Sequence, residues 1–144
     1  MPSFAKTTTC NVIPTMRYRD VPAMIQWLCK ALGFTAHAVH EDGNGGVMHA
    51  QLVFGTGMIM LGPVSDHPLH KYLVQPDEIG GRDTQSSCLI VDDCDAHYAQ
   101  AVAAGAEIID PLSDKEYGGR AYGCLDPEGH AWWIGSYDPW QTEA

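Results

Sequence analysis

The chain has few basic residues and no long apolar run. Its 144 residues include 8 Lys and Arg against 18 Asp and Glu, giving a formal net charge of −10. Nucleic acids and anionic membrane surfaces attract basic patches, so this charge argues against both as partners. No apolar run reaches the roughly 18 residues of a membrane span, and no signal-peptide core follows Met1. We therefore expect a cytoplasmic protein.

Cysteine is also scarce and shows no metal or redox spacing. The five thiols include no CxxC pair and lie at Cys10, Cys29, Cys88, Cys94 and Cys124. An odd, scattered set indicates reduced thiols rather than a disulfide framework. Cys88 and Cys124 fall in predicted strands and are interpreted as small core residues. The segment 43–46 is rich in glycine, but it lacks a lysine and opens no helix, so it predicts no phosphate loop.

The first half of the chain predicts one helix among short strands. Asp20 is a predicted N-cap, and Gly33 is a predicted C-cap. Strand-forming residues bounded by turn residues mark the segments 10–18, 34–40, 47–54 and 58–62.

The second half predicts the same order of elements. Asp92 or Asp93 caps a helix that ends at Gly105. The predicted strands are 86–91, 106–110, 120–125 and 130–137. Residues 111–119, which start with a proline, are predicted to form a loop.

Punctuating residues recur 72 positions apart in the two halves: Asp20 and Asp92, Gly33 and Gly105, Gly57 and Gly129. We therefore predict an α+β fold of two tandem βαβββ modules, 10–62 and 86–137. An irregular connector, 63–85, joins them within a single domain of residues 1–144.

Motifs in both halves resemble one known family. They comprise 13–20, 27–28 and 32–34 in the first half, and Ala-Gly-Ala at 104–106 and Asp-Pro-Glu-Gly-His at 126–130 in the second. These motifs are similar to those of the vicinal oxygen chelate superfamily, which holds glyoxalase I, bleomycin-resistance proteins and extradiol dioxygenases. The resemblance implies two curled mixed sheets around a shared cleft, a homodimer and, in the enzymes, a divalent metal acting as a Lewis acid.

The resemblance also places the metal ligands on the first and last strand of each module. Those columns hold Ile13 or Pro14, Met60 or Leu61, Ser86, and Trp133. A shift by one residue gives Asn11 or Val12, Ile59, Gln85 or Ser87, and Trp132. None is a carboxylate or an imidazole, and a catalytic metal needs about three such ligands. We expect no metal and no cofactor, with a divalent metal on unusual ligands as the alternative.

Strand alternation in 47–54 brings two polar side chains to one face. His49 and Gln51 face the predicted cleft, where His49 would act as an acid or base near neutral pH. The opposite face packs on a helix and carries Met48, Ala50, Leu52 and Phe54. The alternative for His49 and Gln51 is a plain solvent-facing sheet surface.

Adjacent tryptophans must point to opposite faces of the last strand. The resemblance directs Trp133 into the cleft, where it would stack on a planar ligand, with Met60 as a soft apolar wall. Alternatively, both Trp132 and Trp133 belong to the core.

Arg120 and Tyr122 share a face of the preceding strand. There Arg120 would attract a ligand carboxylate, or else form a surface salt bridge. The loop at 117–119 either closes over a ligand or is a plain turn.

The leading interpretation is a protein that binds a small, planar organic molecule in a metal-free cleft, for sequestration of an antibiotic or toxin. The acidic charge suits a cationic ligand. The alternative is a lyase, isomerase or dioxygenase that uses His49 with an unusual metal site or none. A third interpretation is a module for assembly with another protein.

Overall fold

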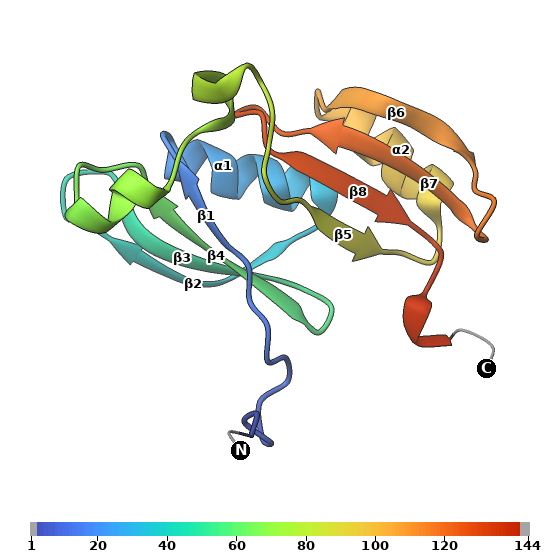
Figure 1. Ribbon diagram of the computed structural model, residues 1–144, viewed down its shortest axis with the longest axis horizontal. Helices are drawn as coiled ribbons and strands as arrows, with labels where there is room; N and C mark the ends of the chain where they lie inside the picture. The colour runs from blue at the N-terminus through green and yellow to red at the C-terminus, as the bar shows by residue number, and fades with distance from the viewer. Residues whose placement is uncertain (1–2, 142–144) are drawn as a thin grey trace. The chain divides into compact units, whose positions relative to one another are not determined.

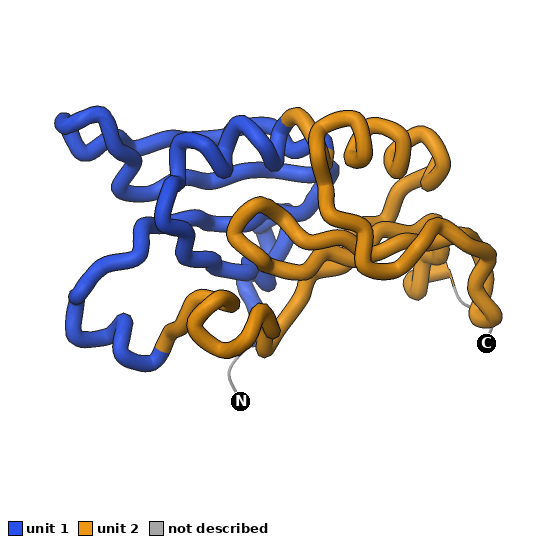
Figure 2. The backbone as a smooth tube through the Cα atoms, turned by 90° about the horizontal axis from the view of Figure 1, so that it is seen from above, with its two compact units in different colours: residues 1–29, 33–72 blue, residues 30–32, 73–144 orange. Residues whose placement is uncertain are grey.

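The computed structural model describes residues 3–141 as a mixed α+β protein with two four-stranded mixed sheets. The chain divides into two compact units (Figure 2). Unit 1 comprises Met1–Cys29 and Gly33–Tyr72, and unit 2 comprises Lys30–Leu32 and Leu73–Ala144. No helix among the described residues is long and apolar enough to cross a membrane.

Unit 1 has four strands and a helix in the order βαβββ (Figure 1). They are β1 Thr15–Tyr18, α1 Val21–Trp27, β2 Thr35–Glu41, β3 Val47–Phe54 and β4 Gly57–Pro63. The sheet order is β1-β4-β3-β2, with β1 and β4 parallel. Asp20 caps α1 by accepting a 3.0 Å hydrogen bond from the Ala23 N–H. A π-helical turn, Leu28–Leu32, then ends at Gly33, which has a φ of 89°.

Unit 2 repeats the order βαβββ. Its elements are β5 Ser87–Ile90, α2 Cys94–Ala103, β6 Glu107–Asp114, β7 Arg120–Leu125 and β8 Ala131–Gly135. The sheet order β5-β8-β7-β6 repeats that of unit 1. Residues 3–141 also contain three short 3₁₀ turns: Pro68–Tyr72, Pro76–Ile79 and Pro139–Gln141.

The repeat extends to the pairing of individual residues. Thr15 lies opposite Met60 in the parallel pair of unit 1. Ser87 lies opposite Trp132 in unit 2, and both residues of this pair stand 72 positions further along the chain. The predicted α+β class and the tandem βαβββ order are therefore confirmed.

The prediction of a loop over 111–119 was wrong, because β6 continues through Pro111 to Asp114. The β6–β7 register shifts twice, first between Ile108 and Asp110 and then between Asp110 and Ser113, the interval that contains Pro111. Pro111 has no paired residue on β7, and β6 is an edge strand, so the missing N–H of Pro111 removes no ladder bond. Proline signalled a loop here only because sequence does not reveal which strand is an edge.

The first predicted strand was too long at its start. Pairing begins at Thr15 rather than residue 10, although the Pro14 carbonyl still accepts a 3.0 Å hydrogen bond from the Met60 N–H. β8 likewise ends at Gly135, two residues before the predicted end.

The core of unit 2 lies between its sheet and α2. Trp132, Tyr122 and Cys124 are fully buried, and Ile134 is 1% exposed. Cys124 pairs with Trp132, and Tyr122 pairs with Ile134, so all four side chains belong to one face of the sheet. Strand alternation therefore gives Trp133 to the opposite face.

A buried carboxylate organises the turn between β7 and β8. Asp126 is 4% exposed, and its Oδ1 accepts hydrogen bonds from the Glu128 and His130 N–H groups at 2.9 and 3.1 Å. Its Oδ2 accepts a 3.0 Å hydrogen bond from Trp132 Nε1. A single side chain thus closes the turn and satisfies the buried indole.

We predict that Asp126→Ala lowers the free energy of unfolding by roughly 2–4 kcal/mol, because it leaves a buried indole N–H without an acceptor. Urea unfolding measures the change. The matched control is Asp42→Ala in the exposed turn of unit 1, where Asp42 Oδ1 also accepts two backbone hydrogen bonds. The control should cost about 1 kcal/mol or less. Equal costs at the two sites would contradict this account.

A half-buried histidine ties α2 to the helical turn at Leu32. His97 Nε2 lies 2.8 Å from the Leu32 carbonyl oxygen, which can only accept, so Nε2 carries the hydrogen. Nδ1 then accepts a 2.7 Å hydrogen bond from the Tyr122 hydroxyl. Burial lowers the pKa of His97 below its ordinary value of 6.5, despite the opposing effect of the Leu32 carbonyl.

The lowered pKa of His97 predicts lost stability in acid. As the pH falls below about 6.5, the unfolded chain binds a proton at this histidine before the folded chain does, so the free energy of unfolding decreases. His97→Gln should flatten this part of the profile, measured by urea unfolding at a series of pH values. His37→Gln, at an exposed position of β2, controls for the loss of a histidine. An unchanged slope in His97→Gln would contradict the assignment.

Candidate ligand-binding site

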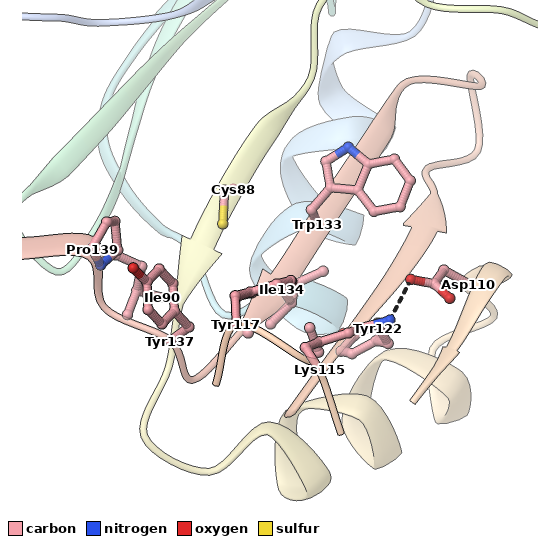
Figure 3. A pocket seen from close by; sticks show the side chains of 12 residues that line it. Cys88, Ile90, Asp110, Lys115, Tyr117, Tyr122, Trp133, Ile134, Tyr137 and Pro139 are labelled. Atoms are coloured by element: carbon pink, nitrogen blue, oxygen red, sulfur yellow. Dashed lines mark hydrogen bonds and ion pairs between the residues drawn. The ribbon is translucent and has the colours of Figure 1, made fainter. Parts of the chain in front are cut away.

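The open face of the unit 2 sheet carries an aromatic cavity of about 460 Å³ (Figure 3). Small residues form its floor, because Ala121 and Gly135 face each other across β7 and β8. The side chains that enclose it are those of Cys88, Ile90, Asp110, Lys115, Tyr117, Trp133, Tyr137 and Pro139. Most of this lining is aromatic or aliphatic.

Trp133 forms one wall and is 39% exposed. Its Nε1 donates a 2.8 Å hydrogen bond to Ser86 Oγ, which fixes the direction of the ring. The ring lies over Gly123, its partner on β7, where a Cβ would collide with the six-membered ring. The indole therefore depends on glycine beneath it and on Ser86 at its edge.

Two tyrosines face each other at the other side of the cavity. The rings of Tyr117 and Tyr137 meet edge to face, with centroids 5.3 Å apart. Tyr117 belongs to a tight turn closed by a 2.9 Å hydrogen bond from the Lys115 N–H to the Gly119 carbonyl. A Cβ on Gly119 would lie 2.6 Å from Ser136 Oγ, so glycine allows this turn to approach the end of β8.

Only one charged pair lines the cavity within the described residues. Lys115 Nζ donates a 2.9 Å hydrogen bond to Asp110 Oδ2. The predicted loop over 111–119 hides Lys115, and nothing in the predicted strand 106–110 marks Asp110 as a cavity residue. The register of β6 brings Asp110 opposite Gly123, and so onto the same face as Trp133.

Cys88 also lies at this cavity, so its interpretation as a core residue was wrong, whereas Cys124 is buried as expected. Cys88 pairs with Trp133 and therefore shares its face. Burial raises the pKa of the Cys88 thiol, and it raises that of Cys124 to about 12. Both thiols are therefore protonated near neutral pH and are poor nucleophiles.

His49, Gln51 and Met60 lie together on the open face of the unit 1 sheet. Gln51 pairs directly with Met60, and Gln51 Nε2 lies 3.3 Å from His49 Nε2. His40, on β2, stacks on His49 with ring centroids 5.9 Å apart. The predicted acid–base residue thus has an amide and a second imidazole beside it.

The predicted alternation of buried and exposed side chains in β3 fails at the first two residues of the strand. Ala50 and Leu52 are fully buried, as the helix-facing set requires, but Met48 is 60% exposed and Val47 is buried. The β2–β3 register shifts beside His40, so that Glu41 lies opposite Val47. Because of this shift, Val47 and Met48 point to the faces opposite to those that simple alternation predicts.

Arg120 and Tyr122 share a face, but it is the face that carries α2. Arg120 forms hydrogen-bonded salt bridges with Asp95 and Asp114, at 2.8 and 3.0 Å. The Tyr122 side chain is fully buried and bonded to His97, and burial raises its pKa. Arg120 does not line the cavity and forms ion pairs instead, whereas Tyr122 is among the lining residues although its side chain is fully buried.

Within each unit, the positions where the family carries its metal ligands lie next to each other, yet the residues at these positions do not fit a divalent cation. In unit 2, Trp133 donates to Ser86, and an indole N–H offers no lone pair to a metal. In unit 1, Pro14 and Met60 meet through their backbones. Shifting by one residue brings Ile59 and Trp132, which are 4% and 0% exposed. Within residues 3–141, no three His, Cys, Asp or Glu side chains group as metal ligands.

The chain belongs to the glyoxalase/bleomycin resistance protein/dioxygenase superfamily, whose family model matches residues 11–134. Among solved structures, it is similar to TioX from Micromonospora sp. ML1, with 31% sequence identity and a TM-score of 0.69. That match covers 85% of this chain and 94% of TioX.

Two further similarities are more distant. An uncharacterised protein of Mycobacterium tuberculosis is 27% identical over 133 residues, which are 90% of this chain and 78% of that protein. The genomically encoded fosfomycin resistance protein of Listeria monocytogenes shares the fold, with a TM-score of 0.65 and 12% identity. The match covers 89% of this chain and 93% of that protein.

We predict that Gly123→Ala displaces the Trp133 ring from the sheet, because the new methyl group would occupy the position of the indole. Near-ultraviolet circular dichroism should lose part of its tryptophan signal, with a stability cost of roughly 1–3 kcal/mol. Gly57→Ala is the control, since its Cβ would meet only the Phe54 carbonyl oxygen, at 3.4 Å. An unchanged spectrum in Gly123→Ala would show that the ring is held elsewhere.

Proposed function

We propose that this protein binds a small, planar and largely apolar organic molecule in the unit 2 cavity, and that it sequesters the molecule without converting it. The observation that carries the proposal is the cavity of about 460 Å³ between Trp133 and the Tyr117–Tyr137 pair. Its volume lies within the usual range for small-molecule pockets, about 300–1,000 Å³. A flat molecule would stack on the indole and bury its edges against the tyrosines.

The chemistry of the lining supports binding without turnover. Within the described part of the chain, the lining residues include no histidine, and the Cys88 thiol is held protonated by burial. The Asp110–Lys115 pair is already joined in a salt bridge. No lining group is thus set up as a nucleophile paired with a base. A fold neighbour is a fosfomycin resistance protein, which agrees with a role in protection from a toxic compound.

The proposal includes a cytoplasmic homodimer. Five free cysteines are consistent with a reducing compartment. Family resemblance supports the dimer, and the net charge of −10 supports a small-molecule ligand over nucleic acid or an anionic membrane. We propose further that binding requires no metal and no cofactor.

The rival proposal is an enzyme of the same superfamily, a lyase, isomerase or dioxygenase centred on His49. One observation favours it, namely the contact of His49 with Gln51 and the stacked His40. Such a group could orient a substrate and move a proton. Recovery of a changed compound after incubation, with the change lost in His49→Ala, would decide for the enzyme.

Equilibrium dialysis with three tricyclic probes tests the leading proposal: neutral phenazine, a phenazine carboxylate and the cationic dye proflavine. We expect at least one probe to bind once per chain and to be recovered unchanged. Trp133→Ala should weaken binding roughly tenfold to a hundredfold, because stacking on an aromatic side chain contributes about 1–3 kcal/mol.

Trp140→Ala is the matched control, because Trp140 is 92% exposed and does not line the cavity. It should bind like the wild type. Binding of none of the three probes would contradict the proposal, as would an equal loss in the two tryptophan variants.

A further inference from the structure

The cavity has one polar corner, and it lies beside the stacking surface. A Cβ built on Gly123 would collide with the Trp133 ring and would stand 3.3 Å from Asp110 Cβ. The Trp133 indole and the Cβ of Asp110 therefore both lie beside Gly123 on the open face of the sheet (Figure 3). A flat ligand stacked on Trp133 would bring one edge to this carboxylate.

The two members of the charged pair are not equally open. The Asp110 side chain is 41% exposed, whereas that of Lys115 is 19% exposed. Lys115 occupies Asp110 Oδ2, and Oδ1 accepts no hydrogen bond from the described residues. The corner thus offers an open carboxylate oxygen, which can accept a hydrogen bond from a ligand.

We infer that Asp110 is a specificity-determining residue, and that the cavity selects planar aromatic molecules bearing a cationic amino group on one edge. This inference rests on the proposed function, because it assigns a ligand class to the same cavity. The amino group donates to Asp110 Oδ1 while the ring system stacks on Trp133.

Two further features support a cation. A positive ring system gains attraction from the face of the Trp133 indole. The chain carries a net charge of −10, which raises the local concentration of cationic ligands. Lys115 opposes the cation by its own charge, but its bond to Oδ2 leaves Oδ1 for the ligand. Removal of Lys115 should therefore strengthen cation binding, which separates this account from recognition of an anion by Lys115.

The test compares proflavine, phenazine and a phenazine carboxylate on the wild type and three variants, by isothermal titration calorimetry at low salt. We expect the wild type to bind proflavine about tenfold tighter than phenazine, because a charge-assisted hydrogen bond is added. Asp110→Asn should remove this preference, because it weakens proflavine binding about tenfold more than phenazine binding. Lys115→Gln should tighten proflavine binding.

Asp114→Asn is the matched control. It removes the same charge from the same strand, but Asp114 pairs with Arg120 and does not line the cavity. It should keep the wild-type preference. Thermal melting verifies that each variant is folded.

Other outcomes overturn the inference in recognisable ways. Tightest binding of the carboxylate, lost in Lys115→Gln, would make Lys115 the recognition residue. Equal weakening of proflavine and phenazine in Asp110→Asn would give Asp110 a structural part only. Phenazine binding that depends on Trp133, with no preference for proflavine, would refute the inference and leave the proposed function intact. Binding of none of the three probes would refute the proposed function itself.

Discussion

The hydrogen bond from the Trp132 indole to Asp126 determines what the rest of unit 2 presents to a ligand. It holds one of two adjacent tryptophans in the core, at 3.0 Å from a carboxylate that also closes the β7–β8 turn. Because neighbouring side chains in a strand point to opposite faces, Trp133 must then lie on the open face. Gly123 beneath its ring and Ser86 at its edge set the orientation of the indole. The Asp-Pro-Glu-Gly turn thereby links a folding constraint to the position of the proposed stacking wall.

The two units share a topology and a pairing register but present different open faces. Unit 1 displays His40, His49 and Gln51, a polar group suited to proton transfer or ligand orientation. Unit 2 displays Trp133, flanked by small floor residues and tyrosines, which suits stacking. Since the buried faces of both sheets are apolar, the repeat preserves the fold while the open faces diverge. Function is therefore assigned from the side chains of each face rather than from the fold.

Sequence reasoning succeeded where local rules act alone. Asp20 and the positive-φ Gly33 and Gly105 mark helix ends by their own chemistry, so the βαβββ order could be predicted. The N-cap of α2 is Asp93 rather than Asp92, so the aspartate pair predicted to recur 72 positions apart was wrong. Sequence reasoning failed where register or strand position decides the outcome. The continuation of β6 through Pro111 depends on its place at the sheet edge, and the exposure of Met48 depends on a register shift beside His40. Lys115 reaches the cavity only through that continuation, and Asp110 shares the cavity face because β6 pairs it with Gly123 after a register shift, so no local pattern could have identified either residue.

Binding in the unit 2 cavity is best tested by an NMR titration of the labelled protein with phenazine, followed through backbone amide and indole N–H signals. We expect the largest shifts on the Trp133 indole and on the amides of Gly123, Gly135 and Tyr137, and we expect phenazine to be recovered unchanged. Shifts concentrated at His49 and Gln51, with Trp133 unaffected, would contradict this expectation and would place the binding site on the open face of unit 1.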